Sequence, residues 1–464
     1  MNHRTRLLTL AFPVYFELLA SVLAGIIDML WVARLGGAAV AAVAVATSTE
    51  NLLLGVILTA AVGTTVRVAH AAGARDHGAL REAVRGGWAL CAVLTPLVAV
   101  GGWLLRDPLA ALVLGGGAGG GDAHGARALA AGYFAISLPG IAVFFAQNVL
   151  DGILKGTGDT RTPMRLSFLA NALILVLDPL LIHGLLGLPA LGVRGAALAT
   201  VLGRAVALAA GCVALRRNPV LRAATRRTPP ARSTLTAARR TAVTGAPMSA
   251  DFVIRMAGGM VMVALVARVG VTAVAAYGIA TKATYVATMA FYALRQAASI
   301  HTAHTEGTGR DDRAAIGRQA LLTGALLGTA AAGALLVAAP ALMRVFGADT
   351  AVTAAGAGYL RCLGPYLVLL ACFIALGGVF QGSGTGRQLA WVTLAGTAVQ
   401  LPLGYVLSGP GAGLGLNGVA LAMAVSAALQ CLAVVGLFRA AVRDRAAPHE
   451  IGTAETPADP ARRG

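Results

Sequence analysis

The chain has 464 residues, of which 57% are hydrophobic and only 12% are charged, and its mean hydropathy is +0.76. A soluble domain carries roughly twice that share of charged residues, so the composition excludes an ordinary soluble protein and indicates a membrane protein with many spans. The net charge of +18 does not indicate nucleic-acid binding, because the basic residues concentrate in alternate loops between apolar segments. The five cysteines all lie in apolar segments without C-x-x-C spacing, and so indicate neither a disulfide nor a metal site.

Apolar segments of membrane-spanning length, about 20 residues each, recur along the whole chain. We predict an all-α membrane protein with two sets of six transmembrane helices. The first set covers residues 7–33, 40–66, 84–105, 128–152, 164–186 and 195–215. The second set covers residues 243–267, 273–298, 318–338, 356–380, 389–407 and 417–438.

The polar segments between these helices predict the domain organisation. Residues 1–215 form an N-lobe, residues 216–242 a basic cytoplasmic linker, residues 243–440 a C-lobe, and residues 441–464 a disordered tail. The Gly-rich stretch 115–125 is expected to be an external loop. Because arginine collects on one set of loops, the positive-inside rule predicts a multi-pass protein of the cell membrane with both termini in the cytoplasm.

The two sets of six helices contain matching sequence motifs. A-F-P ending at Pro13 matches G-A-P ending at Pro247, and A-R-L-G-G beginning at Ala33 matches A-R-V-G-V beginning at Ala267. G-V-R-G-A-A-L-A from Gly192 likewise matches G-L-N-G-V-A-L-A from Gly415. With six helices in each copy, both copies enter the membrane from the same side. Transporters with such parallel repeats bind substrate between the halves and alternate access by rocking them, whereas a receptor or a membrane enzyme gives no reason to expect the duplication.

The most informative stretch runs from Gly152 to Ile182, where a basic Gly-rich turn leads into an apolar helix that contains Asp178 and Pro179. The turn does not match a phosphate-binding loop, since no strand precedes it and no Walker-type lysine follows. An ionisable group inside a membrane helix indicates a functional site. Pro179 removes the helical hydrogen bond of the Leu175 carbonyl, which thereby becomes available to an ion.

A second aspartate, Asp28, is predicted to lie at the same depth in the membrane as Asp178. Arg34 follows Asp28 by six residues and His183 follows Asp178 by five, which places both carboxyl groups about 8–9 Å below the outer ends of their helices. Two neighbouring carboxylates cannot both stay ionised cheaply in a low dielectric, so together they form a proton or sodium site. The alternative is that Asp178 merely satisfies backbone groups at a proline kink.

These residues resemble the multidrug and toxic compound extrusion (MATE) family of antiporters over nearly the whole chain. The resemblance is most specific in K-G-T-G-D-T at residues 155–160, Pro163, L-D-P at residues 177–179, and residues 192–200. The likeness is closer to the DinF-like branch than to the NorM-like branch, which carries a glutamate in helix 7 where this chain has Arg255. The resemblance implies that Asn171 and Thr200 complete the ion site, or alternatively that they only join helices.

One departure from the family pattern concerns the coupling ion. Family members often have asparagine four residues before the helix-5 aspartate, and this chain has Ile174 there. The counterparts of Asp28 and Asp178 in the second half are Met262 and approximately Leu401, so the ion site is expected in the N-lobe alone. Without the asparagine ligand a sodium site is weaker, which favours H⁺ over Na⁺ at Asp28 and Asp178.

Other polar residues inside the apolar segments are candidates for a substrate cavity between the lobes. Acidic Glu50 in the first half would face basic Arg255 and Lys282 in the second half, as a gate or as a site for a substrate with both charge signs. The alternative is ion pairing within the helix bundle. Tyr133, Gln147 and Tyr277 also lie at candidate cavity positions, although aromatic side chains at helical spacing are more often packed.

We therefore predict a monomeric secondary active exporter, not an enzyme, which moves small organic molecules out of the cell in exchange for H⁺ or Na⁺. No cofactor beyond the coupling ion and no nucleic-acid partner is expected. A flippase for lipid-linked saccharides, from the wider superfamily, is the alternative within transport. A membrane scaffold without transport activity is the alternative from another class.

Overall fold

The computed structural model describes residues 2–104, 121–187, 189–227, 233–345, 349–409, 411 and 413–446. Most of the expected Gly-rich external loop and most of the expected tail lie outside these described residues. The described part of the chain is helical and contains no β-strand.

The first half of the chain forms α1 (His3–Ala33), α2 (Gly37–Gly73), α3 (His77–Leu104), α5 (Gly121–Gly156), α6 (Arg161–His183), the short 3-10 helix η1 (Leu185–Gly187) and α7 (Val193–Arg217). A short helix, α8 (Pro219–Arg227), follows. The second half forms α9 (Thr234–Ala267), α10 (Val271–Gly307), α11 (Arg313–Val345), α12 (Thr350–Cys362), α13 (Gly364–Gly382), α14 (Gly386–Ser408) and α15 (Gly415–Ala446).

Eleven of the described helices are long and apolar enough to cross a membrane. They are α1, α2, α3, α5, α6, α7, α9, α11, α13, α14 and α15. Helix α10, with 37 residues, is long enough to span but more polar, because it carries several threonines together with Lys282 and Arg295. With α10, the part of the chain that the structure describes contains the twelve spanning helices that the sequence predicts, six in each half.

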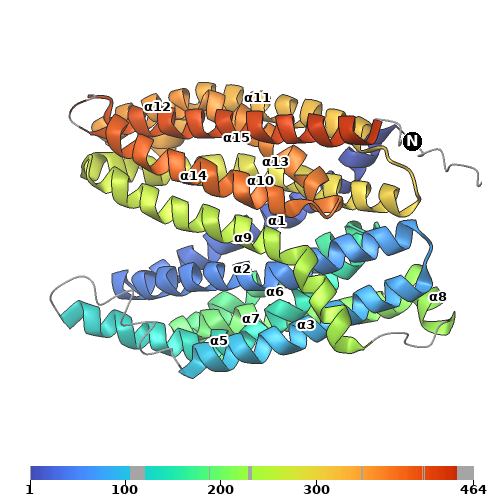
Figure 1. Ribbon diagram of the computed structural model, residues 1–464. Coiled ribbons are helices and arrows are strands. Elements are labelled where there is room, and N and C mark those ends of the chain that lie inside the picture. Colours follow the sequence, from blue (N-terminus) through green and yellow to red (C-terminus); the bar gives the residue numbers. More distant parts are fainter. Residues whose placement is uncertain are drawn as a thin grey trace, which may run out of the picture.

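The helices form two lobes that lie one above the other in Figure 1, with α2, α3 and α5–α8 in the lower lobe and α9–α15 in the upper lobe. The first helix of each lobe reaches across to the other lobe at the end of the bundle where the chain begins. There α9 starts among α2 and α3, and α1 starts against α10. We call this end of the bundle the terminal end and the opposite one the far end.

Glycines permit a very close approach of the lobes near the terminal end. A Cβ atom on Gly63 of α2 would lie 2.2 Å from the carbonyl oxygen of Thr241 in α9, and one on Gly245 would lie 1.9 Å from the carbonyl oxygen of Thr59. Such distances leave no room for a side chain, so the backbones of α2 and α9 touch directly. Small residues at helix interfaces allow this packing in membrane proteins. The lobes are therefore closed against each other at the terminal end.

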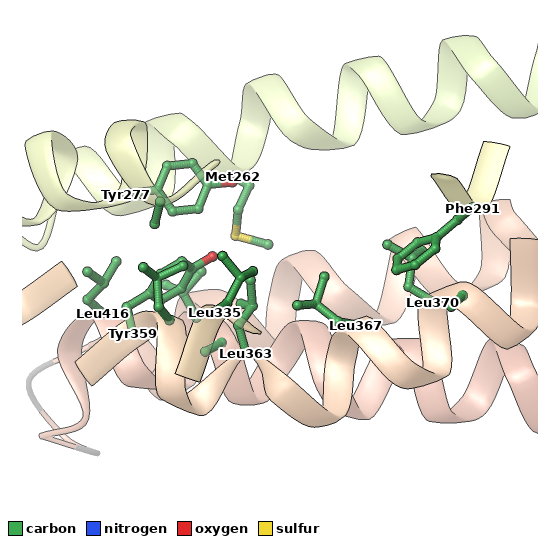
Figure 2. Packing of buried hydrophobic residues seen from close by; sticks show 14 of the residues in the cluster. Met262, Tyr277, Phe291, Leu335, Tyr359, Leu363, Leu367, Leu370 and Leu416 are labelled. Atoms are coloured by element: carbon green, nitrogen blue, oxygen red, sulfur yellow. The ribbon is translucent and has the colours of Figure 1, made fainter. Parts of the chain in front are cut away.

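The apolar core of the C-lobe lies between α9 and α10 on one side and α11, α12, α13 and α15 on the other. Figure 2 shows Met262 and Tyr277 facing Tyr359 and Leu363 across this core. The rings of Tyr277 and Tyr359 are 5.7 Å apart and tilted by 58°. The tenth spanning segment, predicted as one helix over 356–380, is divided at Leu363 into α12 and α13. Pro365 explains the division, because proline favours the first turn of a helix and disfavours its interior.

Candidate ion and substrate sites

Helices α1 and α6 run side by side, and two contacts fix their relative height. Toward the terminal end, the hydroxyl oxygens of Ser21 and Ser167 are 3.4 Å apart. Toward the far end, the rings of Trp31 and His183 lie with centroids 5.9 Å apart. Asp28 on α1 and Asp178 on α6 both lie between these two contacts, and their carboxyl groups are neighbours that interact directly. The structure thus brings together the two aspartates that the sequence places at equal depth.

The surroundings of this aspartate pair provide few hydrogen-bond donors. Asp178 is only 1% exposed. Both of its carboxyl oxygens, and Oδ1 of Asp28, are buried without a hydrogen-bond partner among the described residues. Buried polar atoms are normally satisfied, and two carboxylates without donors repel each other. The pair is therefore chemically suited to hold a proton between its oxygens, or a cation.

Pro179 lies inside α6 directly after Asp178, so the Leu175 carbonyl lacks its helical donor, as the sequence predicts. Ile174, at the position where relatives often have asparagine, is a buried apolar side chain. Asn171 is nearly two turns below Asp178, and its amide donates to the Ser167 hydroxyl at 3.4 Å. Asn171 is thus directed toward Ser167, away from the carboxyl pair.

A small cavity of about 30 Å³ lies in the N-lobe between α2, α5 and α7, and its lining residues Glu50 and Tyr133 are within electrostatic reach of Asp28. Glu50, Tyr133, Thr200 and Arg204 line it. Glu50 and Arg204 attract each other electrostatically, and the Arg204 guanidinium stacks over the ring of Phe144 at 4.3 Å. Thr200 therefore lines the cavity of Glu50, and the partner of this acid is Arg204, which was not among the residues predicted from the sequence.

A larger cavity of about 290 Å³ lies within the C-lobe, and Arg255 and Tyr277 are among its lining residues. Glu50 and Arg255 do not face each other across one cavity as the sequence analysis expected; they line two different cavities in two different lobes. Lys282 lies on an exposed face of α10 and lines neither cavity. Gln147 also lines neither one, and its amide donates to Asp151 Oδ1 at 3.0 Å.

Two buried ion-pair clusters involve partners that were not identified from the sequence, and the second realises for Arg255 the alternative of ion pairing within the helix bundle. In the first, Lys155 Nζ contacts Glu17 Oε1 at 2.7 Å and donates to Gln296 Oε1 at 3.3 Å, which joins the N-lobe to α10 of the C-lobe. In the second, Asp251 Oδ2 accepts from Arg295 at 3.0 Å, and Asp251 Oδ1 lies 3.3 Å from Nε of Arg255.

The internal repeat contained the signal for both clusters. Glu17 follows Pro13 by the same spacing with which Asp251 follows Pro247. An acid on the helical turn after the matching proline in both halves indicates a structural role common to the lobes.

Comparison with known proteins agrees with this architecture. The MatE family model matches residues 13–180 and 247–406, one match in each lobe. A protein from Bradyrhizobium diazoefficiens named "Probable multidrug resistance protein NorM" is 30% identical over 454 residues, which cover 94% of this chain and 93% of that protein. The chain belongs to the MATE family.

Other similarities to this MATE protein are shorter or structural. A "Probable multidrug resistance protein NorM" from Thermotoga maritima is 31% identical over 206 residues, which cover 44% of this chain and 42% of that protein. A MOP superfamily transporter from Pyrococcus furiosus has the same fold, with a TM-score of 0.85, 22% identity, and coverage of 97% of this chain and 98% of that one. The protein is accordingly a multi-span membrane transporter and not an enzyme. Its assignment to the DinF-like branch stays a prediction.

Proposed function

We propose that this MATE protein is a secondary active exporter of small organic molecules in the cell membrane, driven by exchange for a cation. The observation that carries the proposal is the adjoining pair Asp28 and Asp178, whose buried oxygens lack donors. The carboxyl groups are on two different helices of one lobe, so their protonation changes the charge inside that lobe. The multidrug resistance names of the relatives support drugs as substrates.

The coupling ion is H⁺ in this proposal. A hard cation such as Na⁺ is held by several oxygen ligands. Asp178 has the carboxyl group of Asp28 beside it and the unpaired carbonyl of Leu175 in its own helix, whereas Ile174 and the direction of Asn171 remove two further candidate ligands. A proton needs only one pair of oxygens close together, and the two aspartates provide it.

The lobe arrangement supports a direction of transport. The lobes touch at the terminal end through Gly63 and Gly245, and the arginine-rich loops make that end cytoplasmic by the positive-inside rule. The described conformation is then closed to the cytoplasm. Protonation of the aspartate pair from outside favours release of substrate outward, and loss of the proton to the cytoplasm resets the lobes, because proton and substrate prefer different states.

Drug accumulation in a host that lacks its own efflux pumps tests the proposal. We expect wild type to lower accumulation, and Asp28→Asn and Asp178→Asn to abolish this effect at equal expression. Asp311→Asn, which changes an exposed acid in the loop after α10 that pairs with Arg313 far from the aspartate pair, is the matched control and is expected to export normally. Unchanged export by both aspartate variants would overturn the proposal.

Transport measured in liposomes distinguishes H⁺ from Na⁺ as the coupling ion. With purified protein in liposomes, an imposed pH gradient without sodium is expected to drive transport. Transport that requires a sodium gradient and ignores the pH gradient would contradict the choice of H⁺.

A further inference from the structure

The C-lobe cavity contains one more positive than negative charge. Among the described residues that line it, Arg255 is the one with a formal charge. Its partner Asp251 also binds Arg295, whose Nη1 and Nη2 both donate to Asp251 Oδ2 at 3.0 Å. One carboxylate therefore pairs with two guanidinium groups, and the cluster of Asp251, Arg255 and Arg295 carries a net positive charge.

The excess charge is located on the cavity side of this cluster. The side chains of Asp251 and Arg295 are 2% and 5% exposed, whereas that of Arg255 is 20% exposed. Asp251 Oδ1 also accepts a hydrogen bond from Thr393, and Arg255 Nη2 donates to the same threonine at 3.4 Å. Both oxygens of Asp251 are already occupied, and Arg295 is too deeply buried to meet a ligand, so the uncompensated charge of Arg255 is the one available to a group in the cavity. A partly buried charge without a full partner is costly, so an anion there is favoured.

The rest of the cavity wall is aromatic and hydroxylated. Five tyrosines line it: Tyr277, Tyr285, Tyr292, Tyr359 and Tyr366. Tyr292 and Tyr366 lie close enough to Arg255 to interact with its charge, and neither hydroxyl makes a hydrogen bond within the described part of the chain. These two phenols can donate to the anion that Arg255 attracts, while the remaining rings offer faces on which a planar ligand stacks.

We propose that this cavity is a binding site for an aromatic monoanion, with its acidic group on Arg255, Tyr292 and Tyr366 and its ring system among the tyrosines nearer the far end. The tyrosine rings alone would also suit a cation, but the excess guanidinium charge opposes one. Aromatic monoanions would then be a substrate class of the proposed exporter, and this part of the proposal rests on the exporter function. Its test measures binding and needs no transport.

Three ligands of nearly equal shape test the site: 2-naphthoate, 2-naphthalenemethanol and 2-naphthylmethylammonium. We expect isothermal titration of the purified full chain in detergent at pH 7 to show the tightest binding for the acid and the weakest for the ammonium. Equal affinities for acid and alcohol, or tightest binding of the ammonium, would overturn the proposal. This comparison uses the wild-type protein alone and so does not depend on the folding of any variant.

Variants locate the site. Arg255→Gln leaves the Asp251–Arg295 pair intact, and we expect naphthoate to bind about tenfold more weakly or worse, since a charge-assisted hydrogen bond is lost, with little change for the alcohol. Lys282→Gln removes a cation from the same lobe outside the cavity and is expected to change neither affinity. Tyr366→Phe, which removes one hydroxyl, is expected to weaken naphthoate binding alone. Naphthoate affinity that is unchanged in Arg255→Gln would overturn the assignment.

Failure of this inference is distinguishable from failure of the exporter function. Asp28 and Asp178 lie in the other lobe, so Asp28→Asn and Asp178→Asn are expected to bind naphthoate as wild type does while losing export. If wild type exports drugs in a manner that requires the aspartate pair but does not bind naphthoate more tightly than the alcohol, the exporter function is supported and the anion site is excluded.

Discussion

Gly73 and Gly307 occupy the same place in the two lobes, and each lies against the other lobe in the same way. A Cβ atom on Gly73 would lie 2.0 Å from the carbonyl oxygen of His304, and one on Gly307 would lie 2.0 Å from the carbonyl oxygen of His70. The contact between α2 and α10 is thus reciprocal about the pseudo-twofold axis that relates the lobes. With the α2–α9 contacts it closes the terminal end of the molecule.

We predict that Gly73→Ala separates α2 from α10 and weakens this closure. Overpacking of a tight contact costs about 1–3 kcal/mol, so the thermal unfolding midpoint of the purified protein is expected to fall by several degrees. Gly101→Ala is the control, because a Cβ at Gly101 meets nothing within 4 Å. An equal effect of the two substitutions would show that the contact between the lobes is not tight.

Asp251→Asn should destabilise the C-lobe far more than Arg255→Gln does. Loss of Asp251 leaves Arg255 and Arg295 as neighbouring buried cations, and breaking a buried ion pair by removing one partner costs about 3–5 kcal/mol. Arg255→Gln preserves the carboxylate with Arg295 and is expected to cost about 1 kcal/mol or less. Thermal unfolding followed by tryptophan fluorescence compares the stability of the two variants. A lower midpoint for Arg255→Gln than for Asp251→Asn would contradict the sharing of Asp251 by the two arginines.

Lys155→Met should open the contact between the lobes at the terminal end. It removes the ion pair with Glu17 and the hydrogen bond to Gln296 of α10, and it leaves Glu17 and the nearby Asp151 without their cation. We expect a loss of about 3–5 kcal/mol in stability. Addition of Glu17→Gln to Lys155→Met is expected to recover part of that loss, since the uncompensated carboxylate is removed. A double variant no more stable than the single one would exclude the ion pair as the cause.

Asp178→Asn should stabilise the folded protein while it abolishes the proposed exchange. The amide of asparagine supplies a donor to the buried Asp28 Oδ1, which lacks one, and removes the second carboxyl group beside it; the new hydrogen bond is worth about 1 kcal/mol. We expect a higher unfolding midpoint at neutral pH together with loss of export. The control Asp311→Asn weakens an exposed ion pair with Arg313 and should leave export unchanged and shift the midpoint only slightly, since such pairs contribute about 1 kcal/mol or less. A lower midpoint for Asp178→Asn would mean that the carboxylate is satisfied in the resting protein.

The helices themselves were largely predictable from hydropathy, and nine of the twelve expected ranges fall wholly within a described helix. The other three are 84–105, which extends beyond the described end of α3, 164–186, which extends beyond the end of α6, and 356–380, which is divided. The helix ends were not predictable, because hydropathy marks only the part of a helix inside the lipid. Helix α2 continues past the predicted residue 66 to Gly73, and α9 begins at Thr234, ahead of the predicted residue 243. In the tenth segment, residues 356–380 are so largely apolar that hydropathy did not reveal the break between α12 and α13 at Leu363. Pro365 explains this break.

The common depth of Asp28 and Asp178 followed from the sequence alone, since the rise of an α-helix per residue is fixed. That α1 and α6 are neighbours, so that equal depth becomes contact, depended on packing between helices. The partners of the other charges depended on it too. The local sequence of Glu50 does not indicate its pairing with Arg204. The i,i+4 spacing of Asp251 and Arg255 is compatible with an ion pair, but it does not indicate that Arg295 shares the same carboxylate.

The sequence by itself determined the membrane environment, the two repeated lobes and the height of every charge in its helix, because these depend on composition and on a constant helical rise. Only the tertiary structure decided which charges pair, which cavity each lines and at which end the lobes touch. Those features depend on the rotation and contact of whole helices, and the lipid-facing and protein-facing sides of such apolar helices look nearly alike in sequence.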